Sequence, residues 1–152
     1  MKCTFSVLVA NEFGVLARIG FNIESLSVAK TDNGDISRIT LVVEGNDRFL
    51  EQLTKQLNKL IVVHKVSDLT KESVVSRSLA LIKVKATATT RSEIMQIVDI
   101  FRGKIVDVAS NSIMVEITGN EDEITAIEEL LRPFGIKELV RTGKIAMARG
   151  KK

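Results

Sequence analysis

One stretch of the chain has residue types that suit the binding of a small zwitterion: the loop from Asn11 to Arg18. It lies between a predicted strand and a predicted helix start, where free backbone N–H groups and the helix dipole favour a carboxylate. The side-chain oxygen of Asn11 suits an ammonium group, and Gly14 has no Cβ to keep a ligand from the backbone. Taken alone, the same residues equally fit an ordinary turn that caps a helix, which is the commoner use of such a sequence.

A second stretch, Gly20 to Ser25, leads into another predicted strand. If two copies of the chain pair along that strand, Asn22 and Ile23 of one subunit reach the Asn11–Gly14 loop of the other. An apolar ligand side chain would then lie among the aliphatic residues Val15, Leu16 and Ile23. By itself this stretch is a plain turn into a strand.

Residues for catalysis or metal binding are scarce. His64 is the only histidine and has no partner in the sequence for acid–base work, and Cys3 is the only cysteine, which excludes an internal disulfide and suits a reducing compartment. No Cys/His spacing indicates zinc, and no Gly-rich phosphate loop is present. The acidic run at 121–123 is typical of a first helical turn. We therefore predict no catalytic and no metal-binding residues.

The composition narrows the class of partner. The 152 residues are 45% apolar and only 4% aromatic, and 22 basic residues against 19 acidic ones give a net charge of +3. A nucleic-acid binder usually has a denser basic stripe, and an RNA-binding sheet needs exposed aromatic residues, whereas Phe5 is the only aromatic on the predicted strands. No leader and no apolar run of membrane-spanning length is seen, so we expect neither nucleic acid nor a membrane as partner.

The two halves of the chain repeat one order of elements, read from period-two and helical apolar patterns. The first half has strands at 5–9, 23–30, 39–43 and 62–66, and helices at 15–19 and 50–60. The second has strands at 79–84, 105–108, 113–117 and 136–140, and helices at 93–101 and 123–131. Each half is βαββαβ, so we predict an α+β protein of two ferredoxin-like domains, residues 1–72 and 77–152, joined by the polar segment 68–77.

Local signals mark the element ends. Asn33-Gly34 predicts a hairpin turn through positive φ angles, and Gly45-Asn46-Asp47 predicts a helix start. Thr90 with Glu93 reads as a capping box, and Asn120 with Glu123 as a second helix cap.

The strand at 23–30 should be a sheet edge, and an open edge needs a partner. Its Ser25, Ser27 and Ala29 are small enough for close approach. Domains of about 75 residues also bury only about 60% of their unfolded surface. We therefore predict a homodimer that pairs at this strand.

Taken together, these segments resemble the small regulatory subunit of acetohydroxyacid synthase, also called acetolactate synthase. The resemblance spans essentially the whole chain, and its most specific stretches are Asn22-Ile23-Glu24-Ser25-Leu26 and Ile100-Phe101-Arg102-Gly103-Lys104-Ile105-Val106-Asp107. Further matching stretches are Ser6-Val7-Leu8-Val9, Asn11-Glu12, Gly14-Val15-Leu16-Ala17-Arg18-Ile19, Glu51-Gln52-Leu53 and Arg141-Thr142-Gly143-Lys144-Ile145-Ala146.

The resemblance implies an N-terminal ACT domain, which senses amino acids, and a ferredoxin-like C-terminal domain in a non-catalytic subunit. It implies that valine, or else leucine or isoleucine, binds at the ACT dimer interface and inhibits by feedback. Carried over by position, the site comprises Asn11, Gly14, Val15 and Leu16 of one subunit with Asn22 and Ile23 of the other. The implied partner is the catalytic subunit, which would hold thiamine diphosphate, magnesium and FAD, and the implied compartment is the cytoplasm or the plastid stroma.

The sequence departs from the family pattern at two positions. Phe13 stands where the family usually has a small residue or proline, which crowds the ligand loop. Ile19 directly precedes Gly20, where the family has about two more helical turns. Either the domain is truncated or a segment is missing from the printed sequence, and the close match of both flanks favours the second.

Two other functions remain open. Gly14-Val15-Leu16-Ala17-Arg18 imitates the phosphate loop of an acylphosphatase-like hydrolase, but the strand 37–45 lacks the asparagine that would orient the attacking water. An ACT regulator of another amino-acid pathway would share the sensor domain but bind a different catalytic partner.

Overall fold

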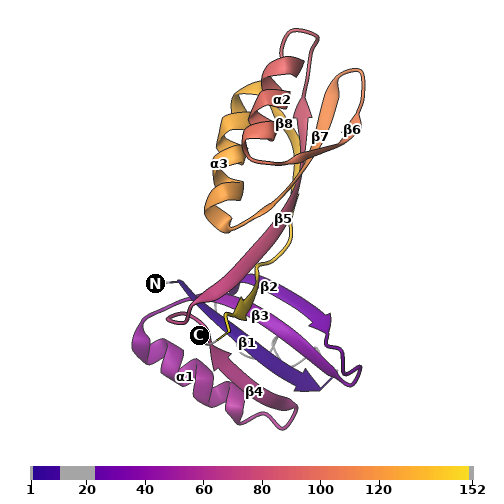
Figure 1. Cartoon of the computed structure of the whole chain (residues 1–152). Coiled ribbons are helices and arrows are strands. Elements are labelled where there is room, and N and C mark those ends of the chain that lie inside the picture. The colour runs from indigo at the N-terminus through magenta and orange to yellow at the C-terminus, as the bar shows by residue number, and fades with distance from the viewer. Residues whose placement is uncertain (1, 11–22, 151–152) are drawn as a thin grey trace. The chain divides into compact units, whose positions relative to one another are not determined.

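The computed structural model describes residues 2–10 and 23–150, and these fall into two compact units (Figure 1). The first unit contains Met1–Val75 together with Gly143–Lys152, and the second contains Ser76–Thr142. The chain therefore leaves the first unit after Val75 and returns to it at Gly143. The domain bounds 1–72 and 77–152 stay a prediction.

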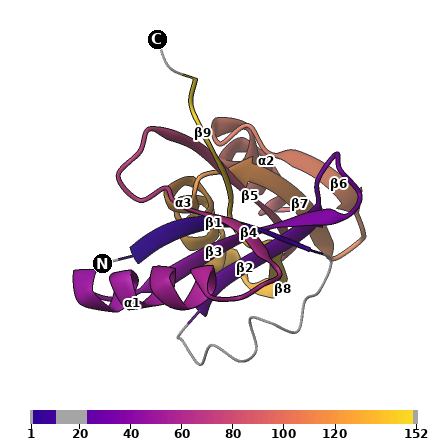
Figure 2. The ribbon, with the colours of Figure 1, turned by 90° about the horizontal axis from the view of Figure 1, so that it is seen from below.

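The first unit is built on a four-stranded antiparallel sheet in the order β2-β3-β1-β4. Its elements are β1 (Lys2–Ala10), β2 (Ile23–Lys30), β3 (Ile36–Glu44), α1 (Asp47–Asn58) and β4 (Val63–Asp68). Helix α1 packs on one face of the sheet (Figure 2) because alternate strand residues and one stripe of the helix are apolar. The buried residues of this core are Cys3, Phe5, Val7, Val9, Ile39, Leu41, Val43, Leu50, Leu53 and Leu57.

The second unit repeats the arrangement with the strand order β6-β7-β5-β8. Its elements are β5 (Val74–Lys85), α2 (Arg91–Ile100), β6 (Lys104–Val108), β7 (Ser112–Gly119), α3 (Glu121–Leu131), a short 3-10 turn (Arg132–Phe134) and β8 (Ile136–Arg141). Both helices cover one face of the sheet. The core is aliphatic, as the composition predicts, and its largest fully buried side chains are Ile82, Ile94, Ile113, Ile117, Ile124, Ile127 and Leu131.

Both sheet orders are those of the ferredoxin-like arrangement, so the predicted α+β fold with two βαββαβ units is confirmed. The helix predicted at 15–19 lies outside the described residues. None of the helices in the described ranges is long and apolar enough to cross a membrane.

The local end signals were partly right. The hairpin at Asn33-Gly34 forms, but neither residue has a positive φ; the Asn33 side chain closes the turn by accepting from the Asp35 N–H at 3.2 Å. Asn46 caps α1, since its Oδ1 accepts from the Phe49 N–H at 2.9 Å. Asn120 caps α3 in the same way at Glu123.

The capping-box prediction for Thr90 and Glu93 is wrong. A side-chain cap needs an extended backbone at the cap residue, whereas Thr90 is already helical, with φ −95° and ψ −15°. Its Oγ1 instead accepts from the Thr87 N–H at 2.9 Å, which binds it into a threonine turn before the helix.

The early start of β5 and the additional strand β9 were not predicted. Strand β5 begins at Val74, inside the segment predicted as a polar linker, and it pairs there with an additional strand, β9 (Ile145–Ala148). The Arg149 N–H donates to the Ser73 carbonyl at 2.9 Å and extends this pairing. The C-terminal residues thus belong to the first unit.

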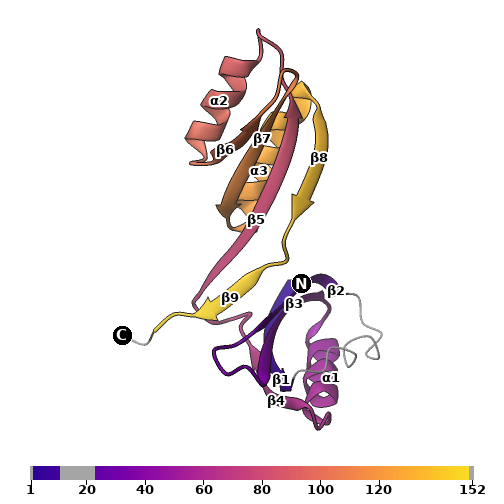
Figure 3. The same ribbon diagram turned by 90° about the vertical axis from the view of Figure 1, so that its right-hand side faces the viewer.

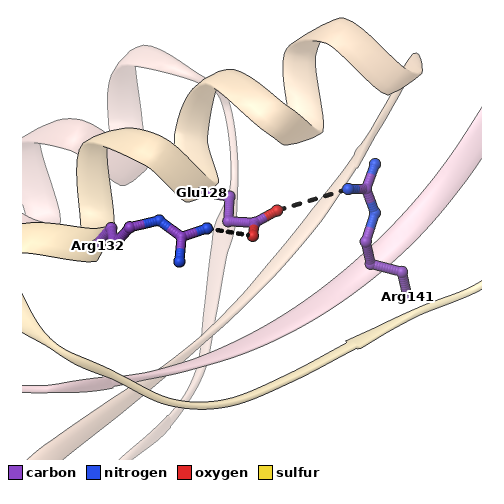
Figure 4. A network of polar contacts seen from close by, with 3 residues as sticks. All are labelled: Glu128, Arg132 and Arg141. Carbon is purple, nitrogen blue, oxygen red and sulfur yellow. Dashed lines mark hydrogen bonds and ion pairs between the residues drawn. The ribbon is translucent and has the colours of Figure 1, made fainter.

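Glu128 fastens helix α3 to the end of β8 (Figure 4). Its carboxylate accepts from Nη2 of Arg132 at 2.8 Å and lies 3.5 Å from Nη1 of Arg141. The Glu128 side chain is mostly buried, at 19% exposed, so this pair of contacts is better shielded from water than a typical surface ion pair. Glu128 therefore links α3 to Arg141, the last residue of β8, within the second unit.

The packing of α3 predicts a sharp contrast between neighbouring positions. Ile127→Ala should lower the free energy of unfolding by about 2–5 kcal/mol, because Ile127 is fully buried and the truncation leaves a cavity. Leu130→Ala, at a half-exposed site of the same helix, should change it by less than about 0.5 kcal/mol. Urea unfolding followed by circular dichroism measures both, and equal effects would contradict this assignment of the core.

Candidate functional site

The structure locates one of the six predicted ligand residues. Ile23 is the first residue of β2. Asn11, Gly14, Val15, Leu16 and Asn22 lie outside the described residues. Strands β1 and β2, which flank residues 11–22, nevertheless constrain how the predicted site can be assembled.

The last residue of β1 and the first residue of β2 lie at opposite ends of the sheet. Ala10, the last residue of β1, pairs with Ile36 at the start of β3, whereas Ile23 pairs with Val43 near the end of β3. Since β1 and β2 both run antiparallel to β3, they are parallel to each other. At about 3.3 Å per residue along β3, the two attachment points are roughly 23 Å apart. The Ala10 end of one sheet and the Ile23 end of the same sheet are therefore too far apart to contact one small ligand.

A β-bulge shapes the start of β2. Ile23 pairs with Val43 and Ser25 with Val42, so Glu24 is the extra residue on the β2 side. Its carboxylate lies 3.4 Å from Nζ of Lys2, and both side chains are about half exposed. A bulge re-aims the side chains beside it. Here it turns Ile23 to the sheet face that carries α1, the face of Leu26 and Val28.

The bulge creates an apolar strip along the outer strand. Ile23, Leu26 and Val28 are 36%, 43% and 38% exposed, respectively, on this face. The break in spacing from Ile23 to Leu26, three residues in a strand of period two, was a signal in the sequence that could have revealed the bulge. Such a strip suits an aliphatic ligand side chain or an apolar surface of another chain.

Strand β2 is also the edge of its sheet, as predicted: among the described strands it pairs with β3 alone. Its other face carries Ser25, Ser27 and Ala29, in register with Val42, Thr40 and Arg38 of β3. An edge with exposed apolar groups and small residues is open to pairing with a further strand.

The remaining candidates are in ordinary structural positions. His64 is an exposed residue of β4, and Cys3 is fully buried in the first core, as expected for a small apolar residue. The acidic residues 121–123 form the first turn of α3. Within residues 2–10 and 23–150, no group of three His, Cys, Asp or Glu side chains is placed to hold a metal ion.

Comparisons with known proteins cover the whole chain. Residues 77–150 match the family model described as the small subunit of acetolactate synthase, and residues 5–65 match that of the ACT domain of small subunits of this type. A probable acetolactate synthase small subunit of Archaeoglobus fulgidus is 54% identical over 100% of this chain and 99% of its own length. An acetolactate synthase small subunit of Aquifex aeolicus is 52% identical over 97% of this chain and 81% of its own length.

A solved structure agrees over the same extent. The crystal structure of the acetolactate synthase small subunit from Thermotoga maritima has a TM-score of 0.90 and 38% sequence identity, and the match covers 100% of this chain and 99% of that one. The alignment with the Archaeoglobus relative extends over 159 positions, so that relative carries residues that the present 152-residue sequence lacks.

Proposed function

The chain belongs to the family of acetolactate synthase small subunits, and we propose that it binds valine between two ACT domains and thereby confers feedback inhibition on the catalytic subunit. Membership of this family gives the chain a regulatory role in branched-chain amino-acid biosynthesis. It also implies a catalytic large subunit as the partner.

The observation that carries the proposal of a site shared by two subunits is the distance between the two strand ends that adjoin the predicted ligand residues. Asn11 directly follows Ala10, and Asn22 directly precedes Ile23, at strand ends roughly 23 Å apart in one sheet. A two-fold dimer through β2 runs the two edge strands antiparallel and brings the Ile23 end of one sheet toward the Ala10 end of the other. Two subunits together would then bring both groups of predicted ligand residues to one ligand.

The chemistry of this composite site fits a branched-chain amino acid. Backbone N–H groups of the Asn11–Gly14 loop would receive the carboxylate, and the side-chain oxygens of Asn11 and of Asn22 from the other subunit would receive the ammonium group. Ile23 with Val15 and Leu16 would surround the aliphatic side chain. The half-exposed state of Ile23 supports this role, since it leaves apolar surface for a ligand to cover.

The catalytic chemistry would reside in the partner. We propose that thiamine diphosphate, magnesium and FAD are bound there, and that this chain raises the partner's activity and lowers it when valine binds. A coupling of this kind typically amounts to roughly 1–3 kcal/mol, or about 5- to 150-fold in affinity. The bacterial and archaeal relatives support the cytoplasm over a plastid as the compartment.

Isothermal titration calorimetry with valine, leucine and isoleucine tests the ligand site. We expect valine to bind, and Gly14→Asp to weaken binding at least tenfold, because a carboxylate would meet the ligand's carboxylate. Gly34→Asp is the matched control, since a Cβ at Gly34 meets no atom within 4 Å. No heat with any of the three amino acids would contradict the proposal, and equal loss in both variants would contradict the location of the site.

Val28→Lys tests the dimer. A lysine on the apolar strip of β2 would place two like charges near the two-fold axis, so we expect the dimer to dissociate at least tenfold more readily and valine binding to weaken with it. Val106→Lys is the control, because Val106 is a half-exposed valine on β6, the edge strand of the second sheet. Sedimentation velocity measures both. A dimer unaffected by Val28→Lys would place the interface elsewhere.

Two alternative functions can be tested with the same purified protein. A regulator of another amino-acid pathway would bind a different amino acid and would not co-purify with a thiamine-diphosphate enzyme. An acylphosphatase-like hydrolase would cleave an acyl phosphate, but β3 contains no asparagine to orient a water molecule.

A further inference from the structure

The residues after the second unit return to the sheet of the first unit and lie on the face opposite α1 (Figure 3). We call residues Gly143–Arg149 the C-terminal strap. The Lys144 N–H donates to Oγ of Ser25 at 3.0 Å, and Nζ of Lys144 donates to Oγ1 of Thr4 at 3.0 Å. One residue of the strap is therefore bound to both β2 and β1.

These two contacts lie on a single row of the sheet. Thr4 and Ser25 both pair with Val42 of β3, so Lys144 crosses three strands at one level. Thr4 and Val42 are buried there, at 7% and 5% exposed. The strap consequently holds the beginning of β2 against the centre of the sheet.

Gly143 makes the closest approach. A Cβ at this position would lie 2.4 Å from the Leu26 carbonyl oxygen and 3.1 Å from Oγ of Ser25, too close for any side chain. Glycine is required here because the strap backbone rests directly on the backbone of β2. At its other end, the strap is fixed by the Arg149 hydrogen bond to Ser73.

The residue just before the strap is anchored in the second unit. The Thr142 N–H donates to the Leu79 carbonyl, and the Leu79 N–H donates to Oγ1 of Thr142, both at 2.9 Å. Thr142 and Gly143 are consecutive, and their Cα atoms are about 3.8 Å apart. One peptide bond thus joins a residue fixed to β5 in the second unit to a residue fixed to β2 in the first.

We propose that the C-terminal strap couples the effector site to the second unit. The proposal rests on the proposed function for the effector, for the location of its site beside Ile23 and for the catalytic partner. Ser25 and Leu26, which the strap contacts, follow Ile23 directly after the bulge at Glu24. A ligand or subunit that shifts the start of β2 must therefore either move Gly143 and Lys144 with it or break their contacts. Thr142, the next residue along the chain, belongs to the second unit.

Gly143→Ala in the complex with the catalytic subunit is the direct test. The added methyl group should lift the strap from β2, so valine should still bind with a Kd within threefold of the unsubstituted protein. The inhibition reached at saturating valine should fall at least fivefold, the low end of a typical coupling. Gly150→Ala is the matched control within the same C-terminal region, because a Cβ there meets no atom within 4 Å.

Lys144→Met is a milder second variant, which keeps the side-chain stem but removes the hydrogen bond to Thr4. It should show the same separation of valine binding from inhibition, to a smaller degree. It replaces Gly143→Ala as the test variant if circular dichroism shows that Gly143→Ala is unfolded. Inhibition equal to that of the unsubstituted complex in a folded strap variant would overturn the proposal.

A measurement without valine distinguishes failure of the strap from failure of the effector assignment. Binding of the catalytic subunit should alter hydrogen–deuterium exchange of β2, residues 23–30, by at least threefold in the unsubstituted chain and not in Gly143→Ala. Unaltered exchange of β2 in the unsubstituted chain, or an equal change in both proteins, would overturn the strap proposal. Absence of valine binding alone would overturn only the proposed effector.

Discussion

The parallel course of β1 and β2 on the two sides of β3 is the constraint on which the proposed regulatory site depends. Antiparallel neighbours can be joined by a short hairpin, whereas parallel strands need a crossover, so the segment that leaves β1 must return to the other end of the sheet before β2 begins. Within one domain, the two stretches proposed to contact the ligand therefore adjoin opposite ends of the sheet. The proposed site therefore needs residues from two subunits.

Strand β2 has three different surfaces, namely its two faces and its edge. Its helix-side face presents the apolar strip that begins with Ile23, its edge is open among the described strands, and its opposite face receives Gly143 and Lys144. The side-chain sizes follow this division. The proposed ligand and second subunit would use the aliphatic face, whereas Gly143 and Lys144 approach the face that carries Ser25, Ser27 and Ala29. The bulge at Glu24 separates the two requirements, since it sets the side to which Ile23 points.

Most of the fold could be predicted from local patterns, but contacts between distant residues could not. Alternation in β1 and β3 and the apolar stripe of α1 each report burial through their own spacing, and the Asn46 and Asn120 caps act within three residues. Thr90 has the same local signature, but its hydroxyl is bound by Thr87 instead, a competition that the pattern does not express. Gly143 carries no local signal at all, because its role depends on Leu26, more than a hundred residues earlier. Of the ligand residues, only Ile23 lies in the described part of the chain, so the site remains a prediction from the sequence.

The two units are connected by two passages of the chain rather than one, and the strap proposal depends on this connectivity. Domains joined by one flexible linker are expected to move independently, so a conformational change in one domain need not affect the other. Here the chain passes between the units twice, at Val75–Ser76 and at Thr142–Gly143, and β9 pairs with β5 beside the first passage. Each passage is flanked by residues that are hydrogen-bonded on either side, such as Ser73 with Arg149 and Leu79 with Thr142. Under the strap proposal, a change at β2 would reach the second unit through the Thr142–Gly143 peptide bond.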